Sequence, residues 1–220
     1  MYKTIKNRIG ENMIHIDLQP EPIHFDESVR RPGKEFLEEC PHPVGDDWKK
    51  NRYWNRCADD LYKAYGGICA YTGQWFSKSV STVSVDHYLP KSLYPEKAYE
   101  WDNYRLTYQM MNSFKGDKIT LDPFKIHNGD IVLDFPSCLV KPKKDSSYEF
   151  KKLAWFTINT LKLNHEIQVS HRYEVVANYA SGYVTRHFLE QKYPFIAMEL
   201  ERQNMYTKIK DIFRLPQTNV

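Results

Sequence analysis

The fold of this chain depends on one stretch, Val85-Asp86-His87-Tyr88-Leu89-Pro90-Lys91-Ser92. Residues 83–88 alternate between apolar and polar types and are rich in β-branched side chains, a pattern typical of a strand. Pro90 ends the strand, because proline cannot donate the hydrogen bond that a central strand requires. Asp86 and His87 are therefore predicted to lie at a strand end.

Two further segments complete a compact unit around this pair. Residues 103–107 predict a second short strand, and residues 108–116 predict a helix that ends at a glycine, as helices commonly do. Such a helix can pack back across the strands and bring Asn112 to Asp86 and His87. Adjacent strand residues point to opposite faces, so Asp86 and His87 can share a site only where the strand ends or bulges.

A carboxylate, an imidazole and an amide oxygen suit phosphodiester hydrolysis. Asp86 and Asn112 offer oxygen ligands of the kind that Mg²⁺ or Mn²⁺ prefers, and His87 offers a neutral base for the attacking water. A divalent cation held there stabilises charge on the phosphate and on the leaving oxygen. The three residues therefore predict a metal-dependent nuclease.

The order and spacing of these residues resemble the HNH endonuclease motif of the ββα-metal fold. The resemblance implies that Asp86 and Asn112 hold Mg²⁺ and that His87 is the general base. It gives Asn103 a catalytic role in fixing the loop between the strands and orienting the histidine. The matching positions are Asp86-His87, Pro90, Ser92, Asp102-Asn103, Leu106, Asn112 and Lys115-Gly116.

Basic residues near this set are candidates for contact with nucleic acid. The net charge of +3 is mild for a nucleic-acid-binding protein, so local clusters matter more than the total. Lys115 matches a position that contacts phosphate in the resemblance, although a solvated helix end also favours lysine. Two further groups fit either phosphate contact or an ordinary charged surface. The candidates are Lys91, Arg105, Lys115 and Lys118, and the two groups are Lys49, Lys50, Arg52 and Arg56, and Lys141, Lys143, Lys144, Lys151 and Lys152.

One departure from the family pattern concerns zinc. Many members carry two Cys-x-x-Cys pairs that bind a structural zinc ion, but here the four positions read Cys69, Thr72, Tyr108 and Met111. Three missing thiolates leave no tetrahedral site. We therefore expect no structural zinc and a unit held by apolar packing, in which Phe114 also takes part.

The expected fold is α+β, with a ββα-metal HNH finger embedded in a mainly α-helical domain that carries an extra β-hairpin. Residues 1–47 are rich in proline and charge and predict an N-terminal extended arm. Residues 48–140 are predicted to form the nuclease core with the hairpin, and residues 141–220 a C-terminal helical region.

The hairpin is predicted from the dipeptide Asn128-Gly129, because both residues tolerate the positive φ of a tight turn. Residues 119–127 and 131–135 flank it as the two expected strands. In the helical region, Pro194 fits the first turn of a last helix, where its missing N–H needs no partner.

Further motifs extend the resemblance over residues 48–180, towards the HNH nucleases of Septu-type and retron-associated phage-defence systems. This resemblance implies an effector nuclease, acting on nucleic acid that we expect to be DNA, together with an ATPase subunit of the ABC or SMC-like kind. The chain has no phosphate-binding Gly-Lys-Ser/Thr loop, so the ATPase is expected to be a separate subunit. The motifs are Cys69-Ala70-Tyr71, Tyr99-Glu100-Trp101-Asp102-Asn103, Leu121-Asp122-Pro123-Phe124, and Thr160-Leu161-Lys162-Leu163-Asn164 with Arg172.

Composition limits the other classes of protein. No stretch approaches the roughly 18 apolar residues of a membrane span, and the first residues lack the apolar segment of a signal peptide, so we expect a cytoplasmic protein without membrane contact. Two alternatives are a non-cleaving nucleic-acid-binding module and a scaffold with a vestigial finger. The first predicts the loss of Asp86, His87 or Asn112, yet all three are present; a metal titration would test the second.

Overall fold

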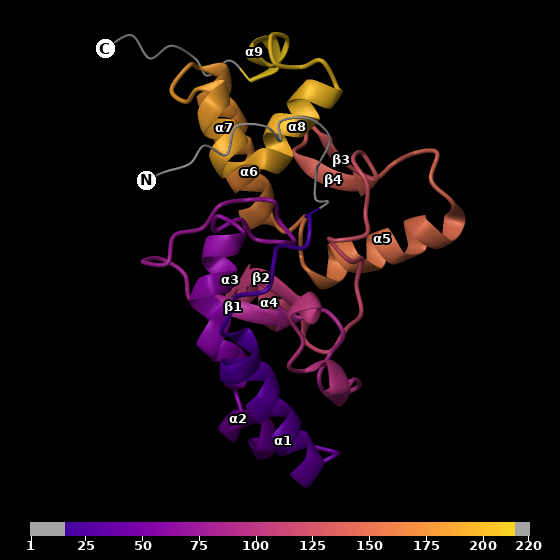
Figure 1. Cartoon of the computed structure of the whole chain (residues 1–220). Coiled ribbons are helices and arrows are strands. Elements are labelled where there is room, and N and C mark those ends of the chain that lie inside the picture. Colours follow the sequence, from indigo (N-terminus) through magenta and orange to yellow (C-terminus); the bar gives the residue numbers. More distant parts are fainter. Residues whose placement is uncertain (1–15, 214–220) are drawn as a thin grey trace.

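The computed structural model describes residues 16–213, which form an α+β fold with two small antiparallel sheets (Figure 1). Strands β1 (Val83–His87) and β2 (Tyr104–Tyr108) make one sheet, and helix α4 (Gln109–Lys115) follows β2 directly. The predicted order of strand, loop, strand and helix is confirmed, and so is the α+β class. The loop contains two 3₁₀ turns, η3 (Pro95–Lys97) and η4 (Trp101–Asn103).

The register of this sheet places the predicted site at its end. His87 is the last residue of β1 and lies opposite Tyr104, while Asp86 lies opposite Arg105. Val85, Leu106 and Met111 are buried between the strands and α4, because the alternation of β1 turns its apolar side chains inward. The strand end predicted from Pro90 is confirmed.

Residues 26–39 are helical, which corrects the extended arm predicted for residues 1–47. A π-helical turn, η1 (Asp26–Arg30), runs into α1 (Arg31–Glu39), and Pro32 stands in the first turn of α1. The wide turn before Pro32, closed by the Arg31 N–H on the Asp26 carbonyl, accommodates a residue that cannot donate its own hydrogen bond. Residues 1–15 of the predicted arm lie outside the described part of the chain.

This N-terminal segment belongs to the core. Phe25 and Val29 are fully buried, and the Phe25 ring packs edge-on against Trp101 at 5.6 Å between centroids. Gly33 lies directly against the Tyr99 ring, where an added Cβ would stand 2.1 Å from the ring carbon Cγ. Close helix packing of this kind requires glycine, whatever the backbone conformation.

The chain between α1 and β1 is divided into short helices. They are α2 (Asp46–Lys50), the 3₁₀ helix η2 (Tyr53–Cys57) and α3 (Ala58–Ala64). Trp48 and Trp54 lie at 6.3 Å between ring centroids, and Trp54 reaches His87. These short helices therefore form a wall beside the end of β1.

The extra hairpin exists, but residues 119–127 are not one of its two strands. Strand β3 (Ile131–Asp134) pairs with β4 (Leu139–Pro142), which follows it, and not with residues 119–127. Gly129 does adopt a turn conformation with φ of 79°, but Asn128 does not have the positive φ that the predicted tight turn requires of both residues. Residues 119–127 form no strand because their polar groups are taken by other elements: the Leu121 N–H donates to Thr157 Oγ1 at 2.8 Å.

The helical region predicted after residue 140 is confirmed. Its helices are α5 (Tyr148–Thr160), α6 (Glu166–Ala180), α7 (Arg186–Lys192), α8 (Pro194–Arg202) and α9 (Ile209–Ile212), with Pro194 beginning α8 as expected. Asn164 donates to and accepts from the backbone of Val140 at 2.8 Å, so it ties β4 to the turn between α5 and α6. No helix within residues 16–213 has the length and apolar character needed to span a bilayer.

The packing of Gly33 against Tyr99 gives a test of the N-terminal helix. Gly33→Ala should lower the free energy of unfolding by about 1–3 kcal/mol, because the new methyl group overpacks a filled site. Urea denaturation measures the change, and Glu35→Ala, an exposed change on the same helix, is the matched control. Equal stability of the two variants would mean that α1 does not pack against Tyr99.

Candidate active site

A cleft of about 460 Å³ opens at the end of β1, between the short N-terminal helices and α4. Asp86, His87 and Asn112 all line it. The structure therefore brings together the three side chains that the sequence placed at one point. Other lining residues are Trp48, Lys49, Arg52, Trp54, Lys91 and Asp117.

The His87 ring is held in one tautomer. Its Nε2 lies 2.9 Å from the Ala98 carbonyl oxygen, and because a carbonyl can only accept, Nε2 carries the proton and Nδ1 is the free base. The rings of Trp54 and Tyr104 pack edge-on against it, at 4.8 and 5.3 Å between centroids. Burial lowers the pKa of His87 to about 3. The imidazole is therefore neutral at physiological pH, with Nδ1 unprotonated.

The Asp86 carboxylate is buried inside a small polar network. Its Oδ2 accepts a hydrogen bond of 2.6 Å from the Tyr71 hydroxyl, and its Oδ1 lies 3.2 Å from the Lys115 ammonium. Lys115 also donates to the backbone carbonyl of His87 at 2.7 Å. Burial raises the pKa of Asp86, while Lys115 and Tyr71 oppose this by stabilising the charged form.

Asn112 presents its amide oxygen for a ligand. Its Nδ2 donates to Ser84 Oγ at 2.7 Å and to the Val85 carbonyl at 3.3 Å. The Val85 carbonyl can only accept, so the amide nitrogen faces β1 and Oδ1 faces away from it. Within the described residues, Oδ1 has no hydrogen-bond partner.

Asp86 and Asn112 carry the kind of oxygen that a hard cation binds, but both carboxylate oxygens of Asp86 already contact Tyr71 and Lys115. Mg²⁺ keeps several waters and is commonly held by one or two carboxylates together with substrate phosphate. Among residues 16–213, no three His, Cys, Asp or Glu side chains gather as a metal site, so Asp86 and Asn112 would share the ion with water and phosphate. The Lys115 ammonium competes for Asp86, which favours loose binding before a phosphate arrives.

Asn103 fixes the loop between the strands, as predicted. Its Oδ1 accepts from the Leu89 N–H at 2.8 Å, and its Nδ2 donates to the carbonyls of Leu89 and Lys97 at 3.0 and 2.9 Å. Lys97 precedes Ala98, so the same amide fixes the backbone next to the Ala98 carbonyl that orients His87. Asn103 is buried and is a positioning residue; it is not among the residues that line the cleft.

The predicted nucleic-acid contacts divide into two pairs. Lys91 lines the cleft, with its ammonium 5.5 Å from the Trp54 ring centre, and Lys118 is exposed beyond the cleft. Arg105 and Lys115 are buried in ion pairs with carboxylates, so the structure does not offer them to a nucleic acid. For these two the prediction is corrected, because each charge already has an internal partner.

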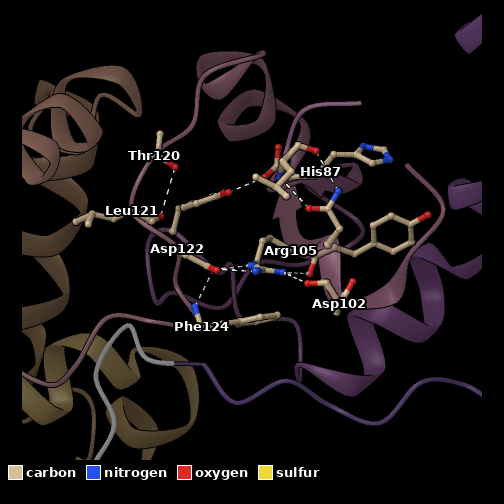
Figure 2. Close-up of polar contacts among 12 residues, drawn as sticks. His87, Asp102, Arg105, Thr120, Leu121, Asp122 and Phe124 are labelled. Atoms are coloured by element: carbon tan, nitrogen blue, oxygen red, sulfur yellow. Dashed lines mark hydrogen bonds and ion pairs between the residues drawn. The ribbon is translucent and has the colours of Figure 1, made fainter. Parts of the chain in front are cut away.

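Arg105 joins β2 to the segment that follows α4 (Figure 2). Its Nε and Nη2 donate to Asp122 Oδ1 at 3.0 and 2.8 Å, and its Nη1 donates to the Asp102 carbonyl at 2.7 Å. The guanidinium also lies 3.5 Å from the centre of the Phe124 ring. The Leu121-Asp122-Pro123-Phe124 motif is thus structural: it neutralises and covers a buried arginine.

The positions that would hold zinc in the related pattern are filled by other contacts. Cys69 is buried with its Sγ 3.5 Å from Thr107 Oγ1, and Met111 is fully buried. The Tyr108 ring packs edge-on against Phe76 at 5.6 Å between centroids, and Thr72 is buried.

Several residues of the site were not assigned a role from the sequence. Tyr71 stood in the Cys-Ala-Tyr motif, but nothing in its spacing indicated that it would reach Asp86. Ala98 acts through its backbone carbonyl, for which no side-chain signal exists. Lys49 and Arg52 line the cleft, which favours phosphate contact over an ordinary charged surface for these two, whereas Arg56 donates to the Ser28 carbonyl.

Comparisons with protein-family models, with curated proteins and with solved structures give no match to this chain. Its function is therefore inferred from the chemistry of the cleft and from the motif resemblance.

The buried pair of Arg105 and Asp122 predicts a large loss of stability when one partner is removed. Asp122→Ala should lower the free energy of unfolding by about 3–5 kcal/mol, because it leaves a buried guanidinium without its anion. Glu201→Ala removes an exposed partner of Arg186 and should cost less than about 1 kcal/mol. If urea denaturation gave similar losses for both, the Arg105 pair would not be buried.

Proposed function

We propose that this chain is a metal-dependent endonuclease of the HNH kind that hydrolyses phosphodiester bonds of nucleic acid, with DNA as the expected substrate. One observation carries the proposal: Asp86, His87 and Asn112 line a single cleft, with His87 held as a neutral base. On this proposal, β1, β2 and α4 are the two strands and the helix of the ββα-metal finger.

Each residue has a distinct role in the proposed reaction. A Mg²⁺ or Mn²⁺ ion held by Asp86 and Asn112 would stabilise the charge that develops on the phosphate. His87 takes a proton from the attacking water at Nδ1. The positive charge then gained by the ring strengthens its Nε2 hydrogen bond to the Ala98 carbonyl, since charge-assisted hydrogen bonds are stronger than neutral ones.

The cleft has the charge that a polyanion requires. Lys49, Arg52 and Lys91 line it, and Lys91 is placed over the rings of Trp48 and Trp54 at 6.0 and 5.5 Å. The aromatic rings favour a cation at that place. These three side chains replace Arg105 and Lys115 as the proposed phosphate contacts within the cleft.

We also propose that the chain works with a separate ATPase subunit in an anti-phage defence complex. This part rests on the motif resemblance and on the mild net charge of +3, which predicts weak non-specific binding of nucleic acid by the chain alone. Incubation of the chain with plasmid and single-stranded DNA plus Mg²⁺, with and without the protein encoded next to it, tests both parts. Cleavage as fast without the neighbour as with it would count against the partnership.

Loss of the base should remove activity without removing the metal site. We expect His87→Ala to slow cleavage by about 100-fold or more, the usual contribution of a general base. Mn²⁺ binding, measured by electron paramagnetic resonance, should persist. His171→Ala changes a half-buried histidine on α6, outside the cleft, and serves as the control. Wild-type rates in His87→Ala would remove His87 from the mechanism.

The metal requirement is tested by chelation and elemental analysis. The purified chain should contain no stoichiometric zinc, because Thr72, Tyr108 and Met111 stand at three of the four ligand positions. A chelator should stop cleavage while circular dichroism shows unchanged secondary structure, since the fold does not depend on a metal. One tightly held zinc ion per chain, or unfolding by the chelator, would contradict the expectation.

A further inference from the structure

The outer face of α5 carries exposed aromatic rings. Tyr148, Trp155 and Phe156 are 76%, 43% and 44% exposed, although rings of this size are usually buried. Their spacing along the helix puts them on one side, while Ala154 and Ile158 face the core. Figure 1 shows α5 at one side of the molecule, with β4 as the neighbouring element.

The same face is basic. Lys143 and Lys144 precede the helix, and Lys151 and Lys152 lie on it, against Asp145 and Glu149 as the acidic residues of the segment. Within the described residues, none of these four lysines takes part in an ion pair, whereas Lys141 pairs with Asp134. An excess of two positive charges therefore stands unneutralised beside the aromatic rings.

A short segment connects the cleft to the buried side of α5, on which Thr157 lies. Gly116 and Asp117 line the cleft, and the Leu121 N–H donates to Thr157 Oγ1 on α5. Between them lie Lys118, which is exposed, and Ile119, which is 38% exposed. The exposed residues between the cleft and α5 are thus Asp117, Lys118 and Ile119.

We propose that the outer face of α5 binds single-stranded nucleic acid, the form of substrate that the cleft would cleave. Aromatic rings beside lysines are the combination that binds single strands, through base stacking and phosphate contact. In a duplex the bases are stacked inside, so rings on a helix face cannot reach them. Aromatic rings are also common in protein interfaces, but lysine is depleted there, so the four unpaired lysines beside the rings favour nucleic acid over a protein partner. This inference rests on the proposed nuclease function and deepens it by naming the form of the substrate.

The test is a binding measurement that needs no cleavage. Fluorescence anisotropy with a labelled oligodeoxythymidylate of about 20 nucleotides, in EDTA and at about 50 mM salt, reports binding where phosphate contacts are strong. The variant is Trp155→Ala/Phe156→Ala. The matched control is Tyr183→Ala/Phe188→Ala, which removes two rings of 77% and 41% exposure near α7. A duplex of the same length is the second ligand.

The α5 variant should bind the single strand about 10-fold or more weakly than wild type, while the control binds normally and duplex binding is unchanged. In Lys144→Gln/Lys152→Gln, the binding constant for the single strand should depend less steeply on salt. The magnitude of the slope of log K against log salt should fall by about 0.7 for each phosphate that is no longer neutralised. Single-strand binding unchanged in the α5 variant overturns the inference. So does a failure of that variant to bind the neighbouring protein while single-strand binding stays intact, which would identify α5 as a protein-docking face.

Failure of this inference and failure of the nuclease proposal give different results. His87→Ala should keep the anisotropy signal and lose cleavage. A wild-type chain that binds single strands through α5 but never cleaves would refute the nuclease alone. A chain that cleaves through His87 but binds equally well without the α5 rings would refute the α5 surface alone.

Discussion

The ion pair of Asp86 and Lys115 is the interaction on which the site depends. Both side chains are almost fully buried, and burying two charges costs several kcal/mol per ion unless geometry and hydrogen bonds offset it. Tyr71 and the His87 carbonyl provide those hydrogen bonds. The pair fixes α4 against the end of β1. Residues three apart share a helix face, so the buried Lys115 positions Asn112, which lines the cleft.

Local signals in the sequence were enough for the centre of the fold. Pro90 marks the end of β1, and Gly116, with φ of 53°, follows the last residue of α4. The convergence of Asp86, His87 and Asn112 also follows from those boundaries. The interior roles of Arg105 and Lys115 could not be predicted in this way, because a basic residue looks the same in sequence whether it meets phosphate or a buried carboxylate. Asp122, the partner of Arg105, became recognisable only in three dimensions.

The other corrections have the same origin in long-range contacts. A turn forms at Asn128-Gly129, yet pairing is decided by what else the flanking chain can bind, and residues 121–124 bind Arg105 and α5. Pro32 is compatible with both a helix start and an extended arm. The helix prevails because its apolar side buries Phe25 and Val29 against residues far along the chain.

That distance along the chain has a consequence for how the protein is made. Arg30, in the N-terminal helical segment, donates a hydrogen bond to Glu100, and the Trp101 indole donates one to the Gln19 carbonyl. These contacts join residues 70 and 82 positions apart. At synthesis rates of about 5–20 residues per second, the segment waits roughly 4–16 s for these partners. During that interval Phe25 lacks the Trp101 and Tyr104 rings against which it packs in the folded chain. The nascent chain thus exposes apolar surface early, and the long-range contacts of its first helical segment can form only after β1 has been synthesised.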